Sequence, residues 1–203
     1  MEFWNSLLTE ESWRLLQEFR KKYNFILIGG WAVYLWIKRQ KSKDIDIVVD
    51  IGELQKLKYE NIGKNDSLKK YEIKKDNIDI DIYVEHYSKL AIPVEDINLY
   101  KESVEGFDVV CPEVLLILKQ GAEINRSGSV KGEKDKVDIM SLLFFYDIDY
   151  EKYRNILEKY KLGNYVEILI SLVRNFREYH DMDLNPRVFK LKKEKILNEL
   201  KRI

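Results

Sequence analysis

A stretch of twenty-five residues, 25–49, constrains the fold of this chain more than any other part of its sequence. Four apolar residues open it and have the length of a short strand, which ends at a turn signal, Gly29-Gly30. An apolar segment and a basic segment follow, and the stretch ends in Asp-Ile-Asp-Ile-Val-Val. In a strand, this alternation puts Asp44 and Asp46 on one face, roughly 6–7 Å apart at a rise of about 3.3 Å per residue.

Both halves of this stretch suit the binding of phosphate and metal. Without Cβ atoms, Gly29 and Gly30 permit a positive φ and a close approach of a ligand to the backbone. A helix beginning at Trp31 would direct free N–H groups and its positive dipole end toward a phosphate. Asp44 and Asp46 would bind hard cations through oxygen, as Mg²⁺ prefers. Their order and spacing favour phosphoryl or nucleotidyl transfer over the alternative, an acidic surface strand after an ordinary glycine turn.

A second alternating segment offers further carboxylates. Residues 78–84 read Ile-Asp-Ile-Asp-Ile-Tyr-Val and are predicted to pair with a strand at 69–75 through a turn-favouring Asp-Asn pair. Asp79 and Asp81 lie on one face of this strand. Three or four like charges on one face would repel one another and raise their pKa values unless a cation binds. This cost is the physical argument for a metal ion.

The Gly-Gly turn followed by Asp-x-Asp between apolar residues resembles the signature of the DNA polymerase β-like nucleotidyltransferase superfamily. The form seen here, Gly29-Gly30-Trp31-Ala32-Val33 with Lys43-Asp44-Ile45-Asp46, is closest to the aminoglycoside and lincosamide nucleotidyltransferases. It also resembles the nucleotidyltransferase-type toxins of abortive-infection toxin–antitoxin systems. The resemblance implies an NTP as substrate and two Mg²⁺ or Mn²⁺ ions as cofactors.

The resemblance also implies roles for individual residues. Catalysis and metal binding would fall to three carboxylates, Asp44, Asp46 and Asp81, with Asp79 as the alternative third member. Asp81 would also help to deprotonate the attacking hydroxyl. The residues that would seat the triphosphate on this strand-turn unit are Gly29, Gly30 and Lys43.

A second passage resembles the same enzymes. A helix is predicted from Pro112 to about Arg126, because proline and an acidic residue begin it, and the Gly/Ser/Lys segment 127–134 is predicted to be a loop. By the resemblance, Lys119 contacts the nucleotide phosphates, and Asp135 or Asp138 orients Lys119 or acts near the acceptor. Lys119 ends a deeply apolar segment, where a lysine needs a partner. A structural Lys–Asp bridge between two helices is therefore the alternative.

The whole pattern predicts an α+β fold. The resemblance implies a nucleotidyltransferase fold, a small mixed sheet flanked by helices, at residues 1–110. A helical C-terminal region, 111–203, is expected to pack on it and shape the acceptor pocket. The other predicted elements are helices at 9–23 and 52–62, a short apolar run at 106–111, and helices at about 150–161, 164–179 and 187–202.

Composition narrows the function classes. Lys+Arg and Asp+Glu balance at 35 each, which argues against a protein that coats nucleic acid non-specifically. The single cysteine, Cys111, excludes a disulfide framework, and the two histidines argue against a histidine-based metal site. No apolar run reaches the roughly 18 residues that span a bilayer, and the first residues lack the basic start of a signal peptide. We expect a cytoplasmic protein without a membrane partner.

These observations predict a metal-dependent nucleotidyltransferase that moves a nucleoside monophosphate from an NTP, such as ATP, to a hydroxyl of a small molecule, RNA or protein. Two other classes stay open. One is a toxin that acts on tRNA or another cellular target and is paired with an antitoxin. The other is a non-catalytic nucleotide-binding member of the fold, against which the costly clustering of carboxylates weighs.

Overall fold

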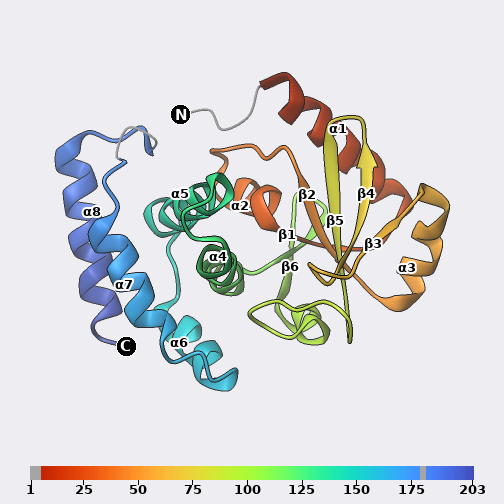
Figure 1. Ribbon diagram of the computed structural model, residues 1–203. Helices are drawn as coiled ribbons and strands as arrows, with labels where there is room; N and C mark the ends of the chain where they lie inside the picture. The colour runs from red at the N-terminus through yellow and green to blue at the C-terminus, as the bar shows by residue number, and fades with distance from the viewer. Residues whose placement is uncertain (1–5, 179–181) are drawn as a thin grey trace. The chain divides into compact units, whose positions relative to one another are not determined.

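The computed structural model describes residues 6–178 and 182–203. The chain divides into two compact units, and the boundary between them lies between Cys111 and Pro112. In the described residues, all strands belong to the first unit, and the second unit contains helices. Figure 1 shows the elements of both units.

The first unit is built on a seven-stranded mixed sheet with the strand order β3-β4-β5-β2-β1-β7-β6. The pairs β2–β5 and β1–β7 are parallel, and the other four are antiparallel. The predicted α+β fold is therefore confirmed. The strands are β1 (Ile26–Ile28), β2 (Ile45–Val49), β3 (Gly63–Asn65), β4 (Lys70–Lys75), β5 (Ile78–Val84), β6 (Lys101–Val104) and β7 (Phe107–Val110).

The alternation in β2 and β5 separates an apolar face from an acidic face. Four isoleucines of these strands, Ile45, Ile47, Ile80 and Ile82, are fully buried. The aspartates between them point to the opposite face, because successive side chains of a strand alternate. Burial of the isoleucine face thus fixes which side of the sheet carries the acids.

Helices complete the first unit (Figure 1). The apolar residues of α2 face in several directions around the helix, and Trp31, Ala32 and Leu35 are all buried, as expected for a helix apolar on all sides. The Trp31 indole Nε1 donates a 2.9 Å hydrogen bond to Ser12 Oγ of α1. The helices are α1 (Ser6–Lys22), α2 (Gly29–Ile37) and α3 (Ile51–Leu57), with 3₁₀ turns η1 (Lys58–Glu60) and η2 (Val94–Tyr100).

The second unit is a helical bundle. Its central helix, α4, has the predicted bounds, and the side chains from Val114 to Leu118 are buried. Gln120 links three helices, since it accepts a 2.6 Å hydrogen bond from Tyr153 and donates a 3.0 Å bond to the Tyr165 carbonyl. The helices are α4 (Pro112–Arg126), α5 (Val130–Phe145), α6 (Tyr150–Lys159), α7 (Tyr165–Asn175) and α8 (Pro186–Leu200).

The structure corrects the predicted loop at 127–134. Only 127–129 lie outside a helix, because α5 begins at Val130. The Ser129 side chain accepts a 3.0 Å hydrogen bond from the Gly132 amide and so caps the helix. Helix α7 ends at Asn175, short of the predicted 179. The sequence also predicts a loop at 181–186; residues 179–181 lie outside the described residues.

None of the helices described for this chain combines the length and the apolar character that a membrane-spanning helix needs.

Candidate active site

Three neighbouring strands carry a row of acids, which we call the carboxylate row: Asp46, Asp81 and Glu72. Asp46 of β2 is the Cα partner of Asp81 on the parallel strand β5. Asp81 is in turn the partner of Glu72 on the antiparallel strand β4. Partners in a sheet point to the same face. Asp44 immediately precedes β2, in a bend two residues before Asp46.

The register distinguishes the two candidates for the third carboxylate. Asp81 lies beside Asp46, whereas Asp79 has Lys74 of β4 as its Cα partner. Asp81 is 8% exposed, and Asp79 is half-buried. By position, Asp81 is therefore the nearer partner of Asp46.

The glycine turn touches this row. Strand β1 pairs Ile28 with Asp46, so the next residue, Gly29, lies against that aspartate. Gly29 has φ +69°, and a Cβ built on it would lie 2.0 Å from Asp46 Oδ2. Only glycine fits such a contact. Helix α2 begins at Gly29 and not at the predicted Trp31, so the two glycines form its first turn.

Lys43, predicted to seat the triphosphate, directly precedes Asp44 in the segment that leads into β2. Both side chains are half-buried. The predicted residues of the first unit thus come from one turn and two adjacent strands, β2 and β5.

Lys70 is a member of this cluster that the sequence analysis did not identify. Its Nζ lies 2.6 Å from Asp81 Oδ2 and 3.1 Å from Glu72 Oε1. Burial by itself would lower the pKa of Lys70, but hydrogen bonds to Asp81 and Glu72 raise the pKa above the ordinary lysine value. The ammonium therefore stays charged near neutral pH. The available signal was that Lys70 and Glu72 are two residues apart on one strand and so share a face.

The donor set can be compared with the needs of a divalent cation. Among residues 6–178 and 182–203, no group of three or more His, Cys, Asp or Glu side chains is arranged to hold a metal ion. The carboxylates of Asp44 and Asp46 are nevertheless the oxygen ligands that Mg²⁺ prefers, and the Asp46 carboxylate fills the space that a Cβ on Gly29 would take. Asp44 and Asp46 therefore suit a divalent cation, whereas Asp81 is already paired with the Lys70 ammonium.

In the helical unit, Lys119 forms the interhelical bridge that the sequence offered as an alternative. Its Nζ lies 3.2 Å from Asp135 Oδ1 and 2.6 Å from Asp138 Oδ2, and all three side chains are buried. Two more cations pair with these buried aspartates and complete what we call the buried ion-pair cluster: Lys134, 3.0 Å from Asp138, and the more exposed Arg126, 2.6 Å from Asp135. Contact of Lys119 with nucleotide phosphates stays a prediction.

Charge pairing keeps Asp138 ionised in this cluster. Burial by itself would raise the pKa of Asp138, but the ammonium groups of Lys119 and Lys134 outweigh it and hold the pKa below the ordinary aspartate value. A buried carboxylate between two lysines is stable only while both charges persist. The cluster thus ties α4 to α5.

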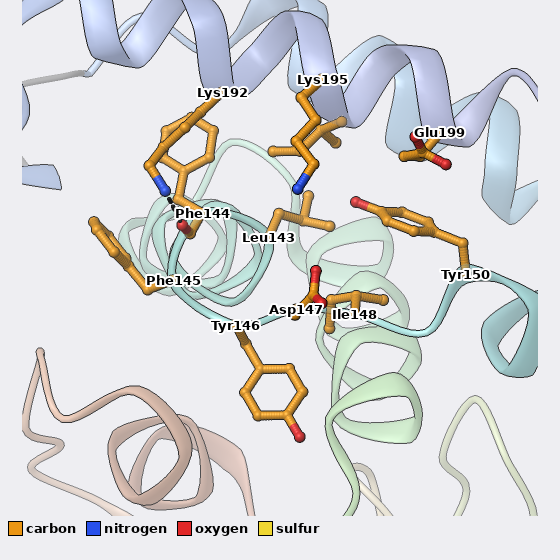
Figure 2. Close-up of a pocket in the computed structure, with 11 residues that line it drawn as sticks. Leu143, Phe144, Phe145, Tyr146, Asp147, Ile148, Tyr150, Lys192, Lys195 and Glu199 are labelled. Atoms are coloured by element: carbon orange, nitrogen blue, oxygen red, sulfur yellow. Dashed lines mark hydrogen bonds between the residues drawn. The ribbon is translucent and has the colours of Figure 1, made fainter.

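Among the described residues, two of the pockets lie away from the predicted site residues, none of which lines either. One, of about 270 Å³, is in the helical unit between the end of α5, the start of α6 and α8. Figure 2 shows the side chains of Lys195 and Tyr150 directed toward its space, while Lys192 donates a 2.5 Å hydrogen bond to the Phe144 carbonyl. The other, of about 320 Å³, is in the first unit and includes Val49 at the far end of β2.

Comparison with solved structures places the fold. The chain is similar to a crystal structure described as that of a "putative nucleotidyltransferase from H. pylori", with a TM-score of 0.50 and 17% identity over 97% of this chain and 96% of the other. At this identity the likeness establishes a nucleotidyltransferase-like fold, as predicted. It says nothing about the aminoglycoside, lincosamide or toxin subtypes.

Other solved structures are also similar to this chain. JHP933 from Helicobacter pylori has a TM-score of 0.47 and 18% identity over 97% of this chain and 93% of its own. An antigenic nucleotidyltransferase-like protein from Paracoccidioides brasiliensis has a TM-score of 0.38 and 16% identity over 75% of this chain and 88% of its own. The sequence matches no protein-family model and no curated protein.

Proposed function

We propose that this chain is a metal-dependent nucleotidyltransferase that moves a nucleoside monophosphate from an NTP to a hydroxyl acceptor. The observation that carries the proposal is the register that pairs Asp46 with Asp81 while Gly29 contacts Asp46. The glycine turn follows β1, the Asp-x-Asp segment includes the start of β2, and Asp81 lies on β5. These three strands are neighbours in the sheet. The turn that would bind phosphate and the strand that would bind a metal ion are therefore neighbours, which supports the proposal.

Each group of the chain has a task in this reaction. Free backbone N–H groups at the start of α2, around Gly29 and Gly30, suit the triphosphate. Asp44 and Asp46 would hold Mg²⁺ or Mn²⁺, which when bound neutralises phosphate charge and polarises the α-phosphoryl group. Asp81 would orient the attacking hydroxyl and accept its proton. The acceptor oxygen bonds to the α-phosphorus as the bond to the pyrophosphate oxygen breaks.

The same chemistry serves a small-molecule, RNA or protein acceptor, and a cytoplasmic location would supply the NTP and Mg²⁺. A toxin that modifies tRNA under control of an antitoxin would use it too. The experiment therefore incubates the purified protein with each α-labelled NTP, Mg²⁺, and either a small-molecule extract or an RNA extract. Label transferred to one extract identifies both the nucleotide and the class of acceptor.

Our first prediction is that Asp46→Asn abolishes this transfer. Calorimetry should show that it also weakens binding of Mg²⁺ with a non-hydrolysable NTP by roughly 10–100-fold, the loss that even outer partners of metal ligands cause. Asp108→Asn is the matched control, because Asp108 is also a strand carboxylate but is paired with Lys101 on β6. Unchanged binding in Asp46→Asn, or no NTP binding by the wild type, would contradict the proposal.

A further inference from the structure

We propose that Lys70 supplies a built-in positive charge in place of one of the two divalent cations, so that the site takes a single metal ion. This inference rests on the proposed function and concerns the charge balance of the same site. It replaces the two-ion arrangement that the sequence resemblance implied. Lys70 acts through Asp81 and is therefore a positioning residue.

The position of the Lys70 ammonium is the first argument. Its Nζ is 2.6 Å from Asp81 Oδ2, a short, charge-assisted hydrogen bond. The same Nζ reaches Glu72 Oε1 at 3.1 Å, so one cation bridges two members of the carboxylate row. A divalent ion would have to compete with the Lys70 ammonium for the same oxygen, Asp81 Oδ2.

Burial is the second argument. The side chains of Lys70 and Asp81 are both 12% exposed, and that of Glu72 is 22% exposed. Water can therefore solvate the ammonium only in part. Separating it from its carboxylates would leave charges without a partner at a costly, partly buried position. This distinguishes Lys70 from a surface lysine such as Lys101, whose side chain is 41% exposed.

The strand hairpin that carries Lys70 is the third argument. Asn65 is the Cα partner of Lys70 on β3, and its Nδ2 donates a 2.9 Å hydrogen bond to Glu72 Oε1. Tyr87 donates a 3.1 Å hydrogen bond to the Asn65 carbonyl. The acceptor oxygen of Glu72 is thus fixed from one side by Asn65 and from the other by Lys70. The hairpin therefore positions the ammonium against the row.

The chemical consequence is a division of labour between one metal ion and one ammonium. The ion at Asp44 and Asp46 would serve the triphosphate. Lys70 would neutralise Asp81 and keep its carboxylate aimed at the acceptor side. Repulsion among clustered acids, which was the sequence argument for a metal ion, is then relieved in part by the Lys70 ammonium.

The test counts metal ions bound to the full-length protein. Mn²⁺ is titrated at a saturating concentration of a non-hydrolysable ATP analogue, and free Mn²⁺ is measured by electron paramagnetic resonance. We expect one bound Mn²⁺ per complex in the wild type and two in Lys70→Met, because the ammonium that lies 2.6 Å from Asp81 Oδ2 is then removed. Lys70→Arg retains the charge and should bind one. Lys101→Met removes the lysine of another cross-strand Lys–Asp pair and should also bind one.

Each outcome decides between the alternatives. Two ions in the wild type, or one ion in Lys70→Met and wild type alike, would overturn the role of Lys70 and leave the proposed function standing. No Mn²⁺–nucleotide binding in the wild type would overturn both. A melting curve checks that Lys70→Met is folded; if it is not, Lys70→Gln, which keeps a hydrogen-bond donor without charge, takes its place with the same expected count of two. If neither variant folds, the count in the wild type and in Lys70→Arg still decides.

Discussion

At the scale of single residues, Gly29 joins the glycine turn to the Asp-x-Asp strand β2 through one contact. A Cβ at this position would lie 2.0 Å from Asp46 Oδ2, closer than any real Cβ contact. Asp46 would have to move, and Asp46 is the residue that we expect to hold the metal ion. The glycine is therefore required by the site as well as by the turn.

Our prediction is that Gly29→Ala costs more stability than Gly128→Ala and also weakens Mn²⁺–NTP binding. Gly128 has a similar φ of +78° but nothing within 4 Å of a built Cβ. Its alanine variant should lose only the cost of a left-handed L-residue, about 1–2 kcal/mol. Gly29→Ala adds the clash with Asp46. Urea unfolding and calorimetry measure the two effects; equal stability losses with unchanged binding would refute the contact.

Single residues also show what the sequence could and could not predict. Alternation predicted that Asp44 shares a face with Asp46, and Asp79 with Asp81, since the period of a strand is fixed. The pairing of Lys70 with Asp81 could not be predicted this way. It depends on the register between β4 and β5, and this register is set by which isoleucines meet in the core.

At the scale of elements, the buried ion-pair cluster between α4 and α5 raises the question of what Lys119 does. The lysine lies 2.6 Å from Asp138, and both side chains are almost fully buried. Removing one partner of a buried pair strands the other charge and costs about 3–5 kcal/mol. An exposed pair contributes at most about 1 kcal/mol.

We therefore predict that Lys119→Met destabilises the protein by about 3–5 kcal/mol, whereas the Arg126→Met control costs clearly less, because the Arg126 side chain is 41% exposed. The double variant Lys119→Met/Asp138→Asn should recover much of the loss. Melting curves give stability, and NTP affinity is measured on the same proteins. If Lys119→Met leaves stability unchanged but weakens NTP binding, the cluster is not the main role of Lys119 and the phosphate contact is.

Whether the sequence could predict an element depends on whether the signal for that element is local. β5 and α4 have the bounds that the sequence predicted, because the first alternates without a break and the second begins at a proline and contains a long apolar segment. β3 and β6 were not predicted. Both are short edge strands with mostly exposed polar side chains, and only their pairing with β4 and β7 makes them strands.

At the scale of the whole molecule, the two units offer different surfaces to a nucleotide. The predicted carboxylates and the glycine turn belong to the first unit, and Lys119 belongs to the second. The pocket shown in Figure 2 is in the second unit and contains none of the predicted residues. Equal numbers of acidic and basic residues give no net charge, so binding of an NTP depends on the local arrangement of charge.

Hydrogen exchange can show which unit responds to nucleotide. The first amides of a helix have no partner within the helix and exchange quickly unless a ligand accepts from them. We predict that Mn²⁺ with a non-hydrolysable NTP slows exchange at the first turn of α2, Gly29–Trp31, and around Asp46. The residues of α8 that line the pocket in Figure 2 should not change. Slower exchange in α4 around Lys119 as well would support its predicted contact with phosphate.

The Asp46→Asn variant is the control for this experiment, because it should abolish the protection at α2 while leaving the fold intact. The fold should stay intact because the Asp46 side chain lies on the face of the sheet that carries the carboxylate row and not in the isoleucine core. Protection that survives in Asp46→Asn would show that the nucleotide binds without the metal-binding strand. Protection confined to the pocket of Figure 2 would move the nucleotide site into the helical unit, and the proposed roles of Gly29 and Asp46 would then be wrong.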